Sequence, residues 1–515
     1  MRTKNSMLNM LVGVVGQLLS LILAFAGRLV FIHYLSSAYL GVNGLFSDVL
    51  GMLNLAELGI GSAMIFSLYL PAANNDEAAL TRLMNLYRLL YRAVAGFVLV
   101  IGLCLMPFLR FLIKGGEGIE HLYLIYLLYL LQSVSSYLLS YKNSIYLAYQ
   151  KAYLKTALDQ VFSILRLLGQ IVVLVLTQNF ILYLMVQLFV PLLSSVVISW
   201  KVDREFPYLK NSRDLPEKDE CRRILKNVGA LSMHKLATVV VRGTDNLLMS
   251  AFVGLSTVGI YSNYKLVLTN ITYLVSRVTT AFTGSIGNLY ATESRARVYE
   301  IYRVLDLCGF LLYGYLAGGM AVLFNLFVRL VFGADYLFSQ TIVLIIVAEF
   351  FISGLRQINL QFREAMGLFW YDRYKAIAEA AINLVVSIFL AQRWGVAGII
   401  GGTIISSVTT CVWVEPYILM RYGMEEAWQE KLKCYFLEYA RRIAVVAGAA
   451  ALSHLVIRFL PDTNLGWFVV DGLLYTAVFG VLILLIYSRT EEFQYLWDKT
   501  LRKLHSKLHS KLHHT

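Results

Sequence analysis

The chain has 515 residues, of which 58% are hydrophobic and 15% charged. This composition leaves little room for a soluble domain, because the longest polar segment has about 25 residues. The net charge of +13 is divided among many short segments, so we interpret it as a sign of membrane topology and exclude nucleic-acid binding. The five cysteines show no paired spacing, which indicates neither a disulfide framework nor a metal site.

Fourteen apolar stretches follow one another along the chain, each long enough to cross a bilayer as a helix. They lie at residues 7–34, 38–68, 88–113, 120–145, 154–177, 180–200, 227–252, 257–289, 304–330, 338–362, 375–392, 396–420, 440–459 and 466–488. We therefore predict an all-α integral membrane protein with 14 transmembrane helices.

Lysine and arginine are distributed unevenly between the two sets of connecting segments. One set, which includes both ends of the chain, holds 33 of these residues, whereas the loops on the other side hold five. Short cytoplasmic loops carry the excess of positive charge in membrane proteins. The bias predicts that both termini lie in the cytoplasm.

Two pairs of sequence windows match at nearly the same shift along the chain. Residues 39–46 align with 257–264 at a shift of 218, and residues 145–153 align with 366–374 at a shift of 221. Each half crosses the membrane an even number of times, so the repeats should be parallel. We expect two six-helix pseudo-repeats followed by two additional helices.

This repeat divides the chain into five predicted parts. They are an N-terminal six-helix bundle (1–202), a cytoplasmic linker (203–226), a C-terminal six-helix bundle (227–421), transmembrane helices 13 and 14 (422–488) and a basic cytoplasmic tail (489–515). The linker is polar and carries Pro207 and Pro216, so we expect a solvated tether. Gly398, Gly401 and Gly402 should permit close approach of helices.

Polar residues within the predicted spans fall on coherent helix faces. An ionisable side chain in hydrocarbon costs roughly 2.5 to 3.5 kcal/mol on insertion scales, so such groups normally face a bundle interior or a wet cavity. The candidates for substrate binding in a cavity are Arg28, Arg166, Lys235, Arg242, Asn263, Asn270, Arg277 and Arg356. The candidates for ion coupling are Glu57, Asp159, Asp245, Glu349 and Glu379.

Interhelical pairing explains any one of these charges equally well. Among the ionisable residues that we select as buried within the spans, however, the second half has five cations (Lys235, Arg242, Lys265, Arg277 and Arg356) against three acids, whereas the first half has two against three. Arginine suits a diphosphate, because its planar guanidinium donates two parallel hydrogen bonds and stays charged. We therefore expect the second half to supply an anion-binding wall.

Several strings resemble bacterial polysaccharide and oligosaccharide flippases of the Wzx-like type. In the first half they are residues 2–6 with Asn9, Gly13 and Gln17, then residues 39–46 and 56–63. In the second half they are Asp245–Asn246 and residues 259–264 and 363–370. The resemblance extends from residue 2 to about residue 420 and depends on the order and spacing of the strings.

The resemblance implies membership of the multidrug, oligosaccharidyl-lipid and polysaccharide exporter superfamily, with two bundles forming a V around a central cavity. It implies transport of an undecaprenyl-diphosphate-linked oligosaccharide to the outer leaflet of the bacterial cytoplasmic membrane, for capsule or exopolysaccharide synthesis. Expected partners are membrane lipids, a polysaccharide polymerase and other assembly proteins. It also implies a monomer, and we expect no cofactor, no metal and no nucleic acid.

Three other functions stay open. A cation-coupled multidrug exporter of the same superfamily is disfavoured because the first span holds Arg28 and no acidic residue. A lipid II flippase is similar in having two additional helices, which help to form a lipid-tail groove in that family. An enzyme acting on the same lipid-linked glycan is disfavoured by outer segments of roughly 4 to 12 residues and the lack of a nucleotide-binding loop.

Overall fold

The computed structural model describes most of the chain between residues 19 and 498. The described ranges are 19–53, 60–109, 113–114, 119–149, 151–225, 228, 243–280, 282–372, 374–460 and 464–498. Helices make up 89% of the structure, and no strand occurs in these ranges. The prediction of an all-α protein is therefore confirmed.

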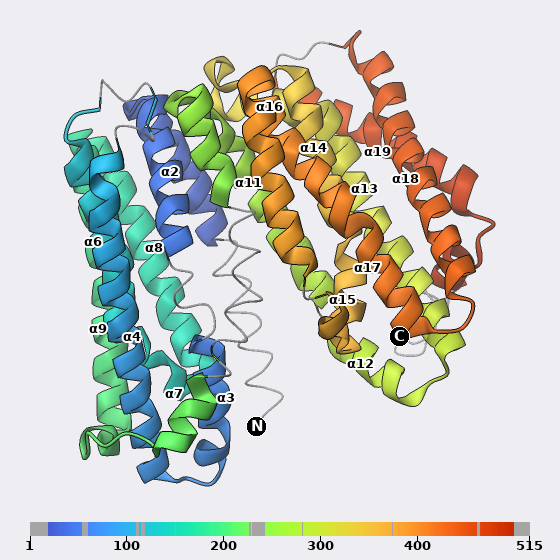
Figure 1. Ribbon diagram of the computed structural model, residues 1–515. Helices are drawn as coiled ribbons and strands as arrows, with labels where there is room; N and C mark the ends of the chain where they lie inside the picture. The colour runs from blue at the N-terminus through green and yellow to red at the C-terminus, as the bar shows by residue number, and fades with distance from the viewer. Residues whose placement is uncertain are drawn as a thin grey trace, which may run out of the picture. The chain divides into compact units, whose positions relative to one another are not determined.

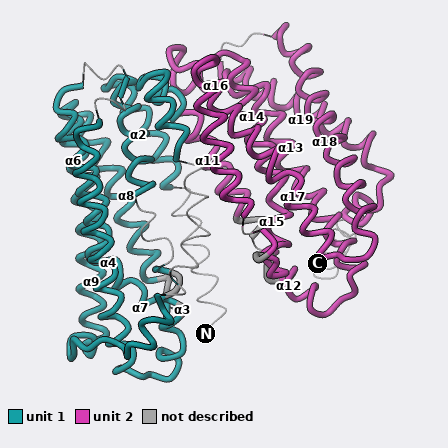
Figure 2. The backbone as a smooth tube through the Cα atoms, in the orientation of Figure 1, with its two compact units in different colours: residues 1–262 teal, residues 263–515 magenta. Residues whose placement is uncertain are grey.

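The chain divides by its internal contacts into two compact units (Figure 2). Unit 1 comprises Met1–Ser262 and unit 2 comprises Asn263–Thr515. The division falls inside the helix α11, Leu255–Thr280, whose first third belongs to unit 1. The predicted boundaries of the five parts and the V-shaped cavity stay predictions.

Nine helices among the described residues are long and apolar enough to cross a membrane. They are Glu77–Phe108, Leu122–Ser140, Leu154–Thr177, Phe180–Glu205, Arg295–Phe332, Gln340–Ala365, Lys375–Met424, Trp428–Ile457 and Leu465–Tyr487. The chain is thus a multi-pass membrane protein, as predicted. The number of 14 spans stays a prediction, since several predicted spans lie partly outside the described ranges.

Unit 1 is a bundle of apolar helices (Figure 1). Its elements are the helix Leu19–Tyr34, α2 (Ser37–Leu53), α3 (Ile60–Ala73), α4 (Glu77–Leu105), α6 (Leu122–Ser140), α7 (Asn143–Ala148), α8 (Ala152–Thr177) and α9 (Phe180–Glu205). The side chain of Asp76 caps α4 and that of Asn179 caps α9, each by accepting from backbone N–H groups of the first turn. The helices α8 and α9 pack against each other, and α6 packs between α4 and α9.

The helices α2 and α11 cross at two glycines within unit 1. A Cβ atom on Gly41 would collide with the carbonyl oxygen of Leu255, and one on Gly259 would collide with that of Ser37. Close helix crossings of this kind require small residues. The shift of 218 found in the sequence converts Gly41 into Gly259 and Ser37 into Leu255. The crossing is therefore reciprocal, which supports the predicted repeat.

The predicted linker is not a free tether throughout. The Nδ2 atom of Asn85 on α4 donates to the carbonyl oxygens of Ser212 and Asp214, both at 3.0 Å. Lys142 forms an ion pair of 2.6 Å with Asp203 near the end of α9. Buried Asn85 therefore holds the backbone of this segment at Ser212 and Asp214, and the role of residues 203–226 as a linker stays a prediction.

Unit 2 contains the second set of long helices. Its elements are α12 (Thr283–Thr292), α13 (Arg295–Phe332), α14 (Gln340–Leu355), α15 (Gln357–Ala365), α16 (Lys375–Ser406), α17 (Val412–Ile418), α18 (Trp428–Ile457) and α19 (Leu465–Tyr487). The predicted additional helices, α18 and α19, both pack on α13. The buried hydroxyl of Tyr475 on α19 donates to the carbonyl oxygen of Tyr315 on α13 at 2.9 Å.

The long run α16 reverses direction at one glycine. Gly395 has φ +54° and ψ −126°, a conformation that glycine adopts readily and other residues do not. On the two sides of this turn, Asn383 Nδ2 donates to Thr403 Oγ1 at 2.9 Å, and Ser387 Oγ donates to the carbonyl of Ile399 at 3.1 Å. The turn separates the two predicted spans 375–392 and 396–420, which agrees with their expected ends.

Two helices begin before the membrane spans predicted for them. The helix α4 begins at Glu77 rather than at residue 88, and α18 begins at Trp428 rather than at residue 440. In both cases amphipathic turns precede the apolar window, and a window chosen by hydropathy omits them. Arg442, near the start of the predicted span 440–459, is a buried residue of α18 with 4% exposure.

Candidate functional site

Two predicted substrate-binding cations of unit 1 lie near the same tyrosine. Arg28 on the helix Leu19–Tyr34 and Arg166 on α8 both lie within electrostatic range of the Tyr183 hydroxyl on α9. Arg28 Nη1 also donates to Ser262 Oγ at 3.1 Å. Both arginines are half-buried. Two permanent positive charges that are 138 residues apart in the sequence thus act on one hydroxyl group of the bundle.

Aromatic rings form a continuous group beside these arginines. The ring centroids of Phe31 and Tyr183 are 5.4 Å apart, and Phe180 stacks on Tyr183 at 5.8 Å. Tyr39 of α2 extends the group, with its centroid 5.1 Å from that of Phe180. Aromatic faces stack on sugars and cations, and buried hydroxyls on such rings seek hydrogen-bond partners. Phe31 and Phe180 are only 3% and 4% exposed, so these two rings belong to the packed core of unit 1.

A second polar contact of unit 1 involves the Asp245–Asn246 string. Asn246 Nδ2 donates to Asp48 Oδ2 of α2 at 2.7 Å, and Asn246 is 2% exposed. On the same helix α2, Asn43 Oδ1 accepts a hydrogen bond from the hydroxyl of Tyr129. Asp245 itself is half-buried. The sequence identified these polar residues but did not indicate which of them pair.

Unit 2 holds a buried ionic cluster. Arg356, which follows α14, donates to both oxygens of Glu415 on α17, at 2.7 and 3.0 Å. Lys375, the first residue of α16, donates to the same carboxylate at 2.5 Å. The side-chain exposures are 12% for Arg356, 7% for Lys375 and 1% for Glu415. A carboxylate with three charge-assisted bonds satisfies the requirement for pairing of buried charges.

Three further side chains complete this cluster. Glu379 lies 3.5 Å from Arg356, and Asp372 accepts from Lys375 at 3.2 Å and also pairs with Arg363. The cluster therefore contains three cations and three carboxylates and is neutral as a whole. This balance favours interhelical pairing as the explanation of Arg356 and Glu379. Glu415 and Lys375 are not among the candidates chosen from the sequence. Glu415 could have been chosen, because it is an acidic residue inside the predicted span 396–420.

The remaining candidates are dispersed. Asp159 pairs with Lys155 at 2.5 Å, Glu349 accepts from Ser353 Oγ at 2.9 Å, and Asn270 donates to the carbonyl of Leu266 at 2.8 Å. Each of these contacts joins two residues of the same helix.

Asn263 is fully buried, with 0% exposure, and its amide forms no hydrogen bond with the described residues. Arg277 belongs to α11, but its side chain is not described. Glu57, Lys235 and Arg242 lie outside the described residues. The roles proposed for these residues stay predictions.

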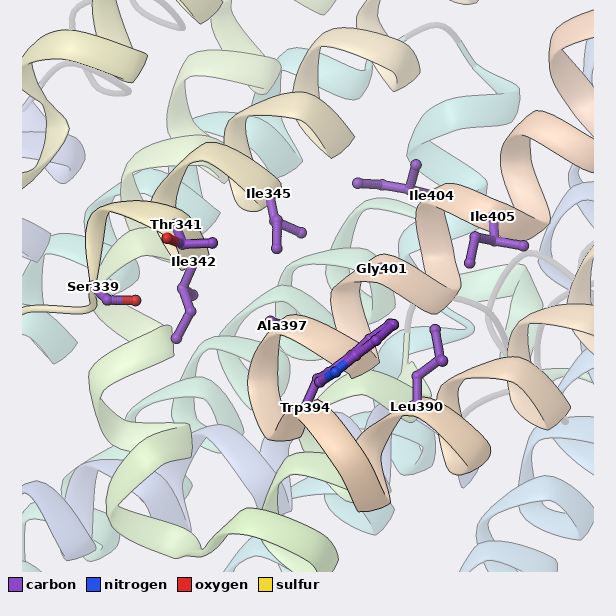
Figure 3. A pocket seen from close by; sticks show the side chains of 10 residues that line it. All are labelled: Ser339, Thr341, Ile342, Ile345, Leu390, Trp394, Ala397, Gly401, Ile404 and Ile405. Carbon is purple, nitrogen blue, oxygen red and sulfur yellow. The ribbon is translucent and has the colours of Figure 1, made fainter.

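One groove of unit 2 has a lining that does not suit a charged ligand. It has a volume of about 630 Å³ and lies between the start of α14 and the turn of α16 (Figure 3). Trp394, Ile342 and Leu390 dominate its lining, and Ser339 and Thr341 contribute the only side-chain hydroxyls of that lining. In a bilayer such a surface contacts acyl chains.

No protein-family model matches the sequence, and no curated protein matches it. The fold, however, is similar to solved transporter structures. The lipid II flippase MurJ in an inward closed conformation has a TM-score of 0.67 at 14% identity, covering 93% of this chain and 99% of that one. An inward-facing multidrug resistance MATE family transporter of the MOP superfamily has a TM-score of 0.60 at 13% identity, covering 79% and 95%.

A point mutant of the Vibrio cholerae MATE transporter VcmN has a TM-score of 0.52 at 14% identity, covering 84% of this chain and 98% of that one. Identities this low establish the fold and not the substrate. The chain thus has the fold shared by the MurJ and MATE structures. These neighbours are transporters or flippases and not enzymes.

Proposed function

We propose that this chain is a flippase for undecaprenyl-diphosphate-linked oligosaccharide repeat units. It moves them from the inner to the outer leaflet of the bacterial cytoplasmic membrane for the synthesis of a surface polysaccharide, by alternating access. The observation that supports the proposal is that Arg28 and Arg166 both lie within electrostatic range of Tyr183 in a bundle of apolar helices. A diphosphate needs permanent cations, and the sugars need aromatic and polar surfaces.

In unit 2, the neutral ionic cluster changes the expected location of the diphosphate. Arg356 is already bonded to Glu415, so it offers less to an anion than the sequence suggested. We accordingly assign the diphosphate to Arg28 and Arg166 first, and keep Lys235, Arg242 and Arg277 as further candidates. The resemblance to Wzx-like flippases supports the polysaccharide pathway, with a polymerase and other assembly proteins as partners.

The test is translocation of a fluorescent undecaprenyl-diphosphate oligosaccharide in proteoliposomes, scored by its accessibility in the outer leaflet. Replacing Arg28 and Arg166 by alanine should slow translocation about tenfold or more, since hydrogen bonds to charged groups contribute about 1.5–3 kcal/mol each. Arg213→Ala removes an exposed arginine of the linker and should leave the rate unchanged. Full transport by the double variant would refute the assignment.

A lipid II flippase is the second candidate. The MurJ fold covers 93% of this chain, and the additional helices α18 and α19 pack on α13 within unit 2. Fluorescent lipid II in the same proteoliposomes separates the two substrates. Efflux of a dye, with no movement of any diphosphate lipid, would instead favour a cation-coupled multidrug exporter.

Ion coupling by an acidic residue is a separate hypothesis. Glu57, Asp159, Asp245, Glu349 and Glu379 are the candidates, and Glu379 already faces Arg356. Collapsing the proton and sodium gradients together should stop net transport. Transport that continues unchanged would exclude coupling to either ion.

A further inference from the structure

A second cavity of unit 2 has many charged residues in its lining, which comes from α13, α18 and the end of α19. Its volume is about 450 Å³. Its lining comes from residues 299–307, 427–442 and 487–492 together with Met420. The last of these segments reaches the tail 489–515, which we predict to be cytoplasmic. A cavity at this level lies where lipid headgroups meet the protein.

Eight charged side chains line this cavity, four of each sign. Most of them are paired with one another. Arg442 donates to Asp306 at 2.8 Å, with side-chain exposures of 5% and 7%, and Arg441 pairs with Glu438 at 2.6 Å. Arg303 pairs with Glu492. The net charge of the lining is therefore zero, which disfavours a purely anionic ligand.

Two charges are left after this pairing. The Nζ atom of Lys431 donates to the carbonyl of Met424 at 3.3 Å and lies 4.9 Å from the ring centroid of Tyr299, but it forms no ion pair with any described carboxylate. Its neighbour Glu430 forms no bond with the described residues either. The cavity thus presents one unpaired cation and one unpaired anion.

The outer surface beside the cavity is apolar. Leu437, which also lines the cavity, is 62% exposed, and Leu484 and Leu485 of α19 are 51% and 74% exposed. In a membrane protein such residues contact acyl chains. A ligand with a charged head in the cavity and hydrocarbon along α18 and α19 would match both surfaces.

We propose that this cavity binds the zwitterionic headgroup of a bilayer phospholipid of the phosphoethanolamine type. The phosphate binds at Lys431 and the ammonium at Glu430, while the acyl chains lie along α18 and α19. The lipid is a resident ligand, distinct from the transported substrate. This inference does not depend on the proposed function, because the cavity is built from unit 2 residues that the transport proposal does not use.

The test measures lipid binding to the purified full chain by native mass spectrometry, with phosphatidylethanolamine and phosphatidylglycerol titrated separately. Lys431→Gln removes the charge and keeps most of the stem. Lys433→Gln is the matched control, because Lys433 lies two residues further along α18, is exposed and does not line the cavity. We expect Lys431→Gln to weaken phosphatidylethanolamine binding about fivefold or more, and Lys433→Gln to leave it unchanged.

Thermal unfolding provides an independent measurement, since a ligand that binds the folded state raises the unfolding temperature. Phosphatidylethanolamine should stabilise the wild type and Lys433→Gln more than Lys431→Gln. Tighter binding of phosphatidylglycerol would overturn the zwitterionic assignment. Equal binding of soluble glycerophosphoethanolamine would overturn the role of the acyl chains, and displacement of phosphatidylethanolamine by undecaprenyl diphosphate would identify the cavity as a substrate site instead.

Discussion

Removing the charge of Glu415 should destabilise unit 2 strongly. Glu415→Gln keeps the shape of the side chain but leaves three cations facing two carboxylates in the buried cluster. Breaking a buried ion pair by removing one partner costs about 3–5 kcal/mol, because the other charge stays buried and uncompensated. The glutamine oxygen can still accept one hydrogen bond, so we expect a loss of about 3 kcal/mol.

The assay is reversible unfolding in mixed micelles by titration with sodium dodecyl sulfate, from which the free energy of unfolding is obtained for each variant. Glu364→Gln is the control, since Glu364 is an exposed carboxylate of α15 and should change stability by less than about 0.5 kcal/mol. Adding Lys375→Met to Glu415→Gln restores the charge balance and should recover part of the loss. A change below about 1 kcal/mol for Glu415→Gln, or no recovery in the double variant, would refute the reasoning.

Three other predictions concern two close helix contacts and the hydrogen bonds that hold the linker. Gly41→Ala forces a Cβ against a backbone carbonyl and should cost about 1–3 kcal/mol or more, whereas Gly51→Ala on the same helix meets nothing within 4 Å and should be neutral or slightly stabilising by the same unfolding assay. Gly402→Ala should lower the unfolding temperature because its Cβ collides with Ser387, while Gly401→Ala should not, and equal effects would argue against the hairpin packing. Asn85→Ala should speed tryptic cleavage of the linker with folding unchanged, and an unaltered cleavage rate would show that the two hydrogen bonds do not hold that segment.

The sequence predicted the helices well because hydrophobic length is a local property. The span 154–177 compares with α8 at Ala152–Thr177, and the span 466–488 with α19 at Leu465–Tyr487. Helix starts were missed where the apolar stripe narrows, as at Trp428. A hydropathy window reports burial in lipid and not the hydrogen bonds that extend a helix beyond it.

The pairing of charges could not be predicted from one sequence. Glu415 binds Arg356 and Lys375, which are 59 and 40 residues away along the chain, and Arg442 binds Asp306 at a separation of 136 residues. Which cation meets which acid depends on how helices pack, and packing brings together residues with no local relationship. The candidates chosen from the sequence therefore included Arg356 and Glu379 but omitted Glu415, the carboxylate that binds Arg356.

The reciprocal crossing of α2 and α11 has a consequence for the origin of the chain. Gly41 lies against Leu255, and Gly259 lies against Ser37. The shift of 218 residues converts Gly41 into Gly259 and Ser37 into Leu255, so the two contacts are equivalent. A contact with this symmetry is the kind that two identical subunits form around a two-fold axis. If the repeat arose by gene duplication, the crossing descends from the interface of an ancestral homodimer, in which one glycine served both sides. After fusion the two sides could diverge independently, and the equivalent positions 37 and 255 now hold different residues, Ser37 and Leu255.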